Sequence, residues 1–299
     1  MINTIALFGE VLADVFPNKT ILGGAPYNVA RHLRAFKQNP ILVSRTGNDA
    51  LREQLLAELS NLGMDATSVQ CDPVYPTGQV NVRMENGKHT FEILPNQAYD
   101  HIHAGLTHLA MLAIRPDLAY FGTLAQRVVE SRLALDMFLS DAKSPRFLDL
   151  NLRYPWYDRH LIRRSLLRAD IVKMNEEELN IICDMFRAPK ANDSAKALFL
   201  MQKFGFKQLL VTCGEHGAWA LTNEGNEARV TGQKIGGELV NTVGAGDGFS
   251  AIYILGVLRN WPMQQTLSRA GEFATALCKI RGAAPESQDF YLPFIRDWN

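Results

Sequence analysis

The chain has 299 residues, of which 47% are hydrophobic and 21% are charged, as in ordinary globular proteins. Lys plus Arg and Asp plus Glu each number 31, so the formal net charge is zero. This balance argues against a nucleic-acid-binding protein, which usually carries a basic excess. No run of about 18 apolar residues occurs, so no membrane span is expected.

The four cysteines are far apart and form no C-x-x-C pair. This spacing argues against a structural zinc site or a disulfide framework, and it suits reduced thiols. The first residues lack a basic segment, and Glu10 interrupts them too early for a secretory signal. We therefore expect a cytoplasmic protein.

Short apolar runs alternate with helical patterns along the chain. In chain order we expect a strand at 5–8, a helix at 26–36, a strand at 41–44, a helix at 51–62, and then strands at 119–121, 147–150, 171–173 and 209–213, each followed by a helical stretch. This β-then-α order predicts an α/β fold, with a mostly parallel sheet covered by helices on both faces.

Two stretches depart from that order. Residues 11–22 have extended character, and residues 77–93 alternate like antiparallel strands, with Asn86 and Gly87 as the expected hairpin turn. Together they predict a small sheet that projects from the main domain. Such a sheet would serve as a lid that excludes water from a reaction, or it is a peripheral ribbon without a catalytic role.

A turn near the C-terminal end carries the strongest chemical signal. Gly244, Ala245 and Gly246 precede Asp247, and an apolar helical pattern follows at once. The first N–H groups of such a helix lack acceptors and lie at the positive end of its dipole, which suits a phosphate oxygen. Asp247 would then take the proton of an attacking hydroxyl. The alternative is a tight turn in which Asp247 caps the helix.

Five further motifs accompany this turn, and together they cover nearly the whole chain. In order, the six are Gly23-Gly24-Ala25-Pro26-x-Asn28-Val29-Ala30, Gly47-Asn48-Asp49, Asp149-x-Asn151-x-Arg153, Lys173-x-Asn175-x-x-Glu178, Thr212-x-Gly214-x-x-Gly217 and Gly244-Ala245-Gly246-Asp247. With these motifs the chain resembles the PfkB-type carbohydrate kinases of the ribokinase superfamily, and most closely their fructokinase branch. The resemblance implies one ribokinase-like domain over residues 1–299, a three-layer sandwich whose β lid draws strands from about 10–24 and 75–100.

The resemblance also implies roles for single residues. Asp247 would be the catalytic base beside the anion hole of Gly244, Ala245 and Gly246. Sugar binding would fall to Asp14, Gly23, Gly24, Asn28 and Arg153, and nucleotide binding to Lys173, Asn175, Thr212, Gly214 and Gly217. Glu178 would reach Mg²⁺ through water. Simpler readings stay open: Asn28 could cap a turn, Asp14 could be a solvated strand residue, and Glu178 could complement a helix dipole.

One position departs from the family pattern. Relatives usually carry Asp where this chain has Asn241, and in several of them that acid belongs to a monovalent-cation site. An amide oxygen can still bind K⁺ but brings no charge, so we expect weak or absent K⁺ dependence. The loop that completes such a site in the family, residues 282–285, is present.

The implied reaction transfers the γ-phosphoryl group of ATP, with Mg²⁺, to a primary hydroxyl of a monosaccharide. Fructose is the first choice of acceptor, and ribose, 2-keto-3-deoxygluconate and a nucleoside remain alternatives, as does a non-catalytic sugar-binding protein on the same fold. Expected partners are the sugar and ATP, with no nucleic acid and no membrane. Exposed edges of the small sheet are compatible with a homodimer formed through the lid.

Overall fold

The computed structural model describes residues 2–85, 88–232, 242–280, 282–285 and 287–298. A nine-stranded sheet runs through the centre in the order β13-β12-β11-β10-β9-β8-β1-β4-β5. Its strands are β1 (Thr4–Phe8), β4 (Asn39–Gly47), β5 (Val69–Asp72), β8 (Leu118–Phe121), β9 (Arg146–Asp149), β10 (Ile171–Asn175), β11 (Gln208–Thr212), β12 (Gly217–Thr222) and β13 (Glu227–Thr231). Neighbouring strands from β5 to β11 are parallel, and β12 and β13 add antiparallel.

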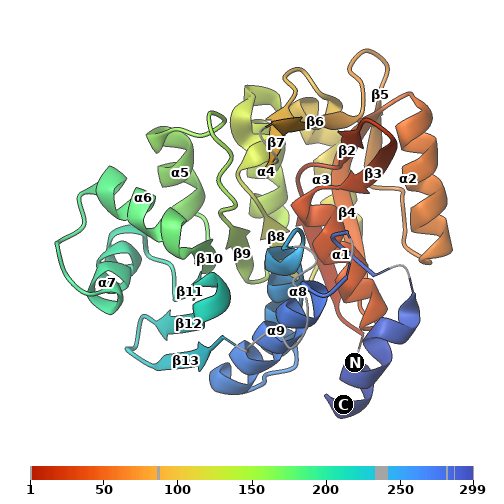
Figure 1. The fold of residues 1–299 in the computed structure, drawn as a ribbon. Coiled ribbons are helices and arrows are strands. Elements are labelled where there is room, and N and C mark those ends of the chain that lie inside the picture. Colours follow the sequence, from red (N-terminus) through yellow and green to blue (C-terminus); the bar gives the residue numbers. More distant parts are fainter. Residues whose placement is uncertain (1, 86–87, 233–241, 281, 286, 299) are drawn as a thin grey trace.

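Helices cover both faces of this sheet (Figure 1). One face carries α1 (Ala25–Ala35), α2 (Ala50–Asn61), α8 (Ala245–Leu258), α9 (Met263–Leu277) and α10 (Leu292–Asp297), and the other carries α3 (Ala104–Ile114), α4 (Val129–Asp141), α5 (Arg159–Leu166), α6 (Glu176–Phe186) and α7 (Asp193–Phe204). The central strand β1 supplies both cores, because Ile5 and Leu7 face the first layer whereas Ala6 and Phe8 face the second. The expected α/β sandwich with a mostly parallel sheet is confirmed.

Four strands form a second, separate sheet in the order β3-β2-β6-β7. They are β2 (Leu12–Phe16), β3 (Lys19–Gly23), β6 (Gly78–Glu85) and β7 (Lys88–Ile93), so they come from the two stretches that break the β-then-α order. Figure 1 shows this sheet at the top of the view, while both chain ends lie at the bottom. The expected hairpin turn at Asn86 and Gly87 lies outside the described residues.

The sequence pattern misses some of the main sheet. The strand expected at 41–44 extends over Asn39–Gly47, and no strand was predicted for β12 or β13. The edge strand β13 is half exposed and contains polar residues. It was missed because it lacks the continuous apolar run that marks the central strands. Among the described residues, no helix is both long and apolar enough to cross a membrane.

Candidate active site

The turn before α8 is held in a conformation that suits glycine. Gly244 is the N-cap of α8 with φ of 84°, in the left-handed region. A Cβ at Gly244 would lie 2.4 Å from the carbonyl oxygen of Ala283, so the loop at 282–285 packs directly on this turn. The N–H of Ala245 closes the turn onto the Thr242 carbonyl oxygen at 3.3 Å. Asp247 therefore stands in the first turn of α8 and is not its cap.

The Asp247 carboxylate meets a residue from the start of the chain. The side-chain amide of Asn28, in α1, donates a hydrogen bond to Oδ2 of Asp247 at 2.8 Å. Asn28 is only 5% exposed, so this bond is sheltered from water. It brings α1 and α8 together at the point where both helices begin, and α1 and α8 also pack on each other along their length.

Burial changes the proton affinity of Asp247. The pKa of its carboxyl is raised from 3.8 to about 6, chiefly by desolvation and also by the negative charge of Asp149, whereas the hydrogen bond from Asn28 lowers it. The positive charges of Lys173 and Arg153 lower it. The group is thus ionised at neutral pH, yet it binds a proton far more readily than a solvated aspartate.

Three other predicted sugar-side residues lie around the same point. Asp14 is in β2, and a Cβ on Gly23 of the paired strand β3 would lie 3.8 Å from its Oδ2. Desolvation raises the pKa of Asp14, and the guanidinium of Arg153 opposes this shift. Arg153 follows β9, and its positive charge lowers the pKa of Asp14 and of Asp247 alike, so it acts on the small sheet and on α8.

Gly24 explains how the chain turns from β3 into α1. It is the N-cap of α1 with φ of 105°, and a Cβ there would lie 2.5 Å from the carbonyl oxygen of Glu10. The segment after β1 and the start of α1 can therefore approach this closely because Gly24 has no side chain.

Lys173 lies beneath the turn and is tied to an acid. Its ammonium group contacts both oxygens of Asp149, at 3.0 and 3.1 Å, and a Cβ on Gly246 would lie 3.2 Å from its Nζ. Ser250 of α8 also donates to Asp149, at 2.7 Å. Burial lowers the pKa of Lys173, but Asp149, Glu178 and Asp247 together raise it by more, so the lysine keeps its charge next to the first turn of α8.

Gly246 also lines a cavity of about 890 Å³. Its volume is within the usual range for small-molecule sites. Six residues predicted for the nucleotide or the anion hole line it: Asn175, Thr212, Gly214, Gly217, Ala245 and Gly246. Lys173, predicted for the same function, is not among the residues that line this cavity.

Glu178 has a structural partner for each oxygen. Oε1 accepts from the N–H of Leu152 at 2.6 Å and Oε2 from the N–H of Asn175 at 2.8 Å, while the Asn175 side chain accepts from the N–H of Glu178. Asn175 and Glu178 thus form a capping box at the start of α6. Within the described ranges, no group of three His, Cys, Asp or Glu side chains is arranged to hold a metal ion. Asn241 lies outside the described residues.

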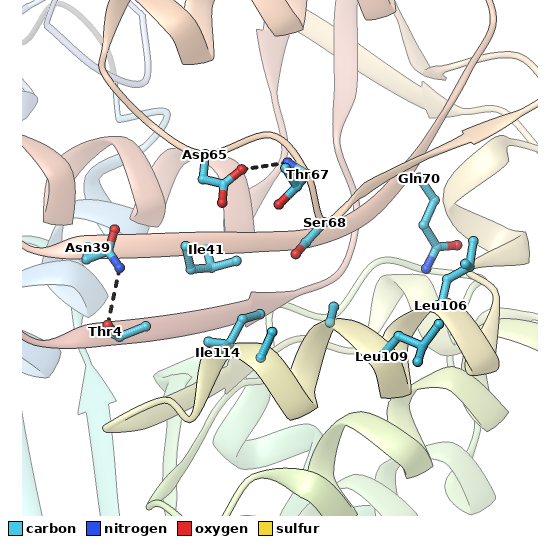
Figure 2. Close-up of a pocket in the computed structure, with 12 residues that line it drawn as sticks. Thr4, Asn39, Ile41, Asp65, Thr67, Ser68, Gln70, Leu106, Leu109 and Ile114 are labelled. Carbon is cyan, nitrogen blue, oxygen red and sulfur yellow. Dashed lines mark hydrogen bonds between the residues drawn. The ribbon is translucent and has the colours of Figure 1, made fainter.

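A second cavity, of about 520 Å³, lies between α3 and the starts of β1 and β4 (Figure 2). It includes Thr4 and Asn39, the first residues of β1 and β4, and the exposed Leu106 and Leu109 of α3. Its one acidic lining residue, Asp65, accepts from the N–H of Thr67. Parallel sheets bind ligands at the carboxyl ends of their strands, and this cavity lies at the amino ends, so we do not place the active site there.

Sequence reasoning gave no role to three residues of the site. Asp149 opens one of the quoted motifs and Glu10 comes shortly after the first predicted strand, so a search for acids at the carboxyl ends of strands would have found both. Ser250 gave no signal, because a serine inside an apolar helix is common and its bond to Asp149 joins positions 101 residues apart.

The chain belongs to the pfkB family of carbohydrate kinases, whose model matches residues 3–289. It is 25% identical over 293 residues to an ATP-dependent 6-phosphofructokinase of Thermoanaerobacterium thermosaccharolyticum, covering 91% of this chain and 86% of that protein. It is 25% identical over 272 residues to a fructokinase of Escherichia coli, covering 84% and 83%. A fructokinase double mutant of Vibrio cholerae, in a form with bound fructose, ADP and potassium ion, superposes with a TM-score of 0.78 at 21% identity, covering 97% of this chain and 98% of that one. The protein is thus a sugar kinase, an enzyme that acts on a sugar and a nucleotide.

Proposed function

We propose that this kinase transfers the γ-phosphoryl group of ATP to a primary hydroxyl of a monosaccharide, with fructose as the preferred acceptor. The hydrogen bond between Asn28 and Asp247 carries the proposal. It sets a carboxylate between the cavity at Gly246 and the polar residues of α1 and the small sheet. A group at this boundary can reach a sugar hydroxyl on one side and a terminal phosphate on the other.

Asp247 acts as the general base in this proposal. With a pKa of about 6 it is mostly ionised at neutral pH, and it is still basic enough to take the proton of the attacking hydroxyl. The first N–H groups of α8 and the ammonium of Lys173 hold positive charge where the transferred phosphoryl group develops negative charge.

ATP occupies the cavity lined by Asn175, Thr212, Gly214 and Gly217 in this proposal. Glu178 offers Mg²⁺ little direct ligation, because both of its oxygens already accept backbone N–H bonds. Each of these oxygens keeps a further lone pair, so Glu178 fits a magnesium ion held mainly by phosphates and water. Mg²⁺ would neutralise phosphate charge there. We propose weak K⁺ dependence from the residue type at Asn241 alone.

The charges near the sugar-side residues favour a neutral acceptor. The carboxyls of Glu10, Asp14 and Asp247 all act together with the guanidinium of Arg153. A sugar acid or a sugar phosphate would bring a further negative charge next to Asp247, which is mostly ionised at neutral pH, and next to Glu10, which is partly ionised there. Like charges in a desolvated site repel strongly. We further propose that the small sheet of β2, β3, β6 and β7 closes over the sugar as a lid.

An ADP-release assay over a panel of acceptors tests the proposal. The panel contains fructose, ribose, 2-keto-3-deoxygluconate, fructose 6-phosphate and a nucleoside. We expect sugar-dependent turnover with fructose, and a loss of about 10²–10⁴ in turnover with unchanged ATP binding in Asp247→Asn. Near-wild-type turnover of that variant would overturn the role of Asp247, and the absence of turnover with every acceptor would favour a non-catalytic sugar-binding protein.

A further inference from the structure

Glu10 is a buried acid to which the mechanism above assigns no contact with the substrate. It follows β1 directly after Gly9, at the carboxyl end of a central strand of the main sheet. It is only 4% exposed, and glutamate is seldom buried to this degree in proteins. A carboxyl at this depth requires hydrogen-bond partners, because transfer from water without them is costly.

The Glu10 carboxyl is only half satisfied. The backbone N–H groups of Glu10 itself and of Ala25, the first residue of α1, lower its pKa, so they lie close to the carboxyl. Oε2 is buried and has no hydrogen-bond partner among the described residues. Desolvation dominates, and it raises the pKa of Glu10 from 4.5 to about 7.

A second buried acceptor without a partner belongs to the same site. The amide nitrogen of Asn28 is taken up by Asp247, so Oδ1 faces away from that bond, and Oδ1 also lacks a donor within the described part of the chain. Glu10 and Asn28 are linked through the site, since Asp247 and Arg153 both act on the charge of Glu10. Buried polar atoms in native proteins nearly always have partners, so two acceptors beside one candidate base indicate donors that a ligand brings. Sugar hydroxyls are such donors.

We infer that Glu10 is a substrate-binding residue whose Oε2 accepts a hydrogen bond from a hydroxyl of the acceptor sugar, next to the one accepted by Oδ1 of Asn28. The inference rests on the proposed function, because it needs a sugar in this site. Glu10 then determines which hydroxyl pattern binds, whereas Asp247 handles the hydroxyl that reacts. Arg153, whose positive charge lowers the pKa of both acids, keeps their charges compatible in one site.

Kinetics of Glu10→Gln with fructose and with its monodeoxy analogues tests this inference. Glutamine keeps the shape but replaces the charge, and a hydrogen bond to a charged group corresponds to about 10- to 100-fold in binding. We expect KM for fructose to rise by that factor while KM for ATP stays within about twofold. One monodeoxy analogue, which lacks the contacted hydroxyl, should give the same kcat/KM with the variant as with the wild type. Glu10→Met keeps the volume of the side chain but has no acceptor, so it should lower kcat/KM for fructose further. The same monodeoxy analogue should again give the kcat/KM of the wild type.

Glu224→Gln provides the matched control, because Glu224 is exposed in the turn between β12 and β13. The KM values of this variant for fructose and for ATP should equal those of the wild type. Wild-type KM for fructose in both Glu10 variants would overturn the inference and leave the sugar kinase proposal standing. An equal loss with fructose and all analogues, together with a lower melting temperature, would also overturn it, since Glu10 would then be structural. Absence of turnover by the wild type with every sugar would instead refute the proposed function, and the inference with it.

Discussion

Asp247→Asn should make the protein more stable above pH 6 while it abolishes most turnover. The pKa of Asp247 is raised from 3.8 to about 6, chiefly by desolvation. Below pH 4 the carboxyl is protonated in both the folded and the unfolded chain and contributes nothing to stability. Between pH 4 and 6 only the unfolded chain loses the proton, so stability falls as pH rises, and above pH 6 the full penalty of about 3 kcal/mol is present.

Asparagine removes this penalty because it carries no charge, and its amide oxygen can still accept the bond from Asn28. With an unfolding entropy of about 2.1 cal/mol/K per residue, 3 kcal/mol corresponds to about 5 °C in melting temperature for a chain of this length. Calorimetry at pH 4.5 and at pH 8 measures the effect, which should be about a third of its full size at the lower pH and nearly complete at the higher one. Asp184→Asn, the same change on the exposed face of α6, is the control and should shift the melting temperature little at either pH. An Asp247→Asn variant that is no more stable than the wild type at pH 8 would refute the argument from burial.

The remaining predictions concern the pH profile, Gly244 and K⁺. The value of kcat/KM for fructose should fall about tenfold per pH unit below about pH 6, because Asp247 must be ionised to act as the base. Glu10 also titrates nearby, so the Glu10→Gln variant isolates the titration of Asp247 in the pH profile. A flat profile down to pH 5 would contradict the role of Asp247 as the base. Gly244→Ala should lower the melting temperature and turnover together, since alanine costs about 1–2 kcal/mol in the left-handed region and its Cβ would collide with Ala283; a circular dichroism melt and the coupled assay measure both, and a wild-type-like variant would contradict the tight packing of this turn. Addition of K⁺ to an assay free of Na⁺ and K⁺ should raise turnover little, and Asn241→Asp should increase the response; a large stimulation of the wild type by K⁺ would refute this expectation.

The local elements of the site could be predicted because their signals are local. Small residues before Asp247 and the apolar spacing after it indicate a turn that enters a helix, and α8 does begin at Ala245 with Gly244 as its cap. Asn175 and Glu178 are three residues apart, which is the spacing of the capping box that they form. Parallel strands were predictable because strands and helices alternate in the sequence.

The pairings between distant residues could not be predicted. No local pattern indicated that the ammonium group of Lys173 pairs with Asp149, 24 residues away, or that Lys173 lies outside the lining of the cavity; its contact with a nucleotide stays a prediction. Nothing near Glu10 in the sequence indicates that it is buried with one oxygen unpartnered, since burial depends on what α1 and α8 bring to it.

The sequence by itself determined the class of fold, the family and the positions of the turns, because hydrophobic period, glycine and helix caps act over a few residues. Only the tertiary structure decided that Asn28 and Asp247, 219 residues apart, share a hydrogen bond, and that Glu10 lies beside them. The order of strands in the sheet brings these residues together at the carboxyl ends of the parallel strands, and the exclusion of water there sets their proton affinities. Neither the order of strands nor the local loss of water is encoded in any short stretch of the chain.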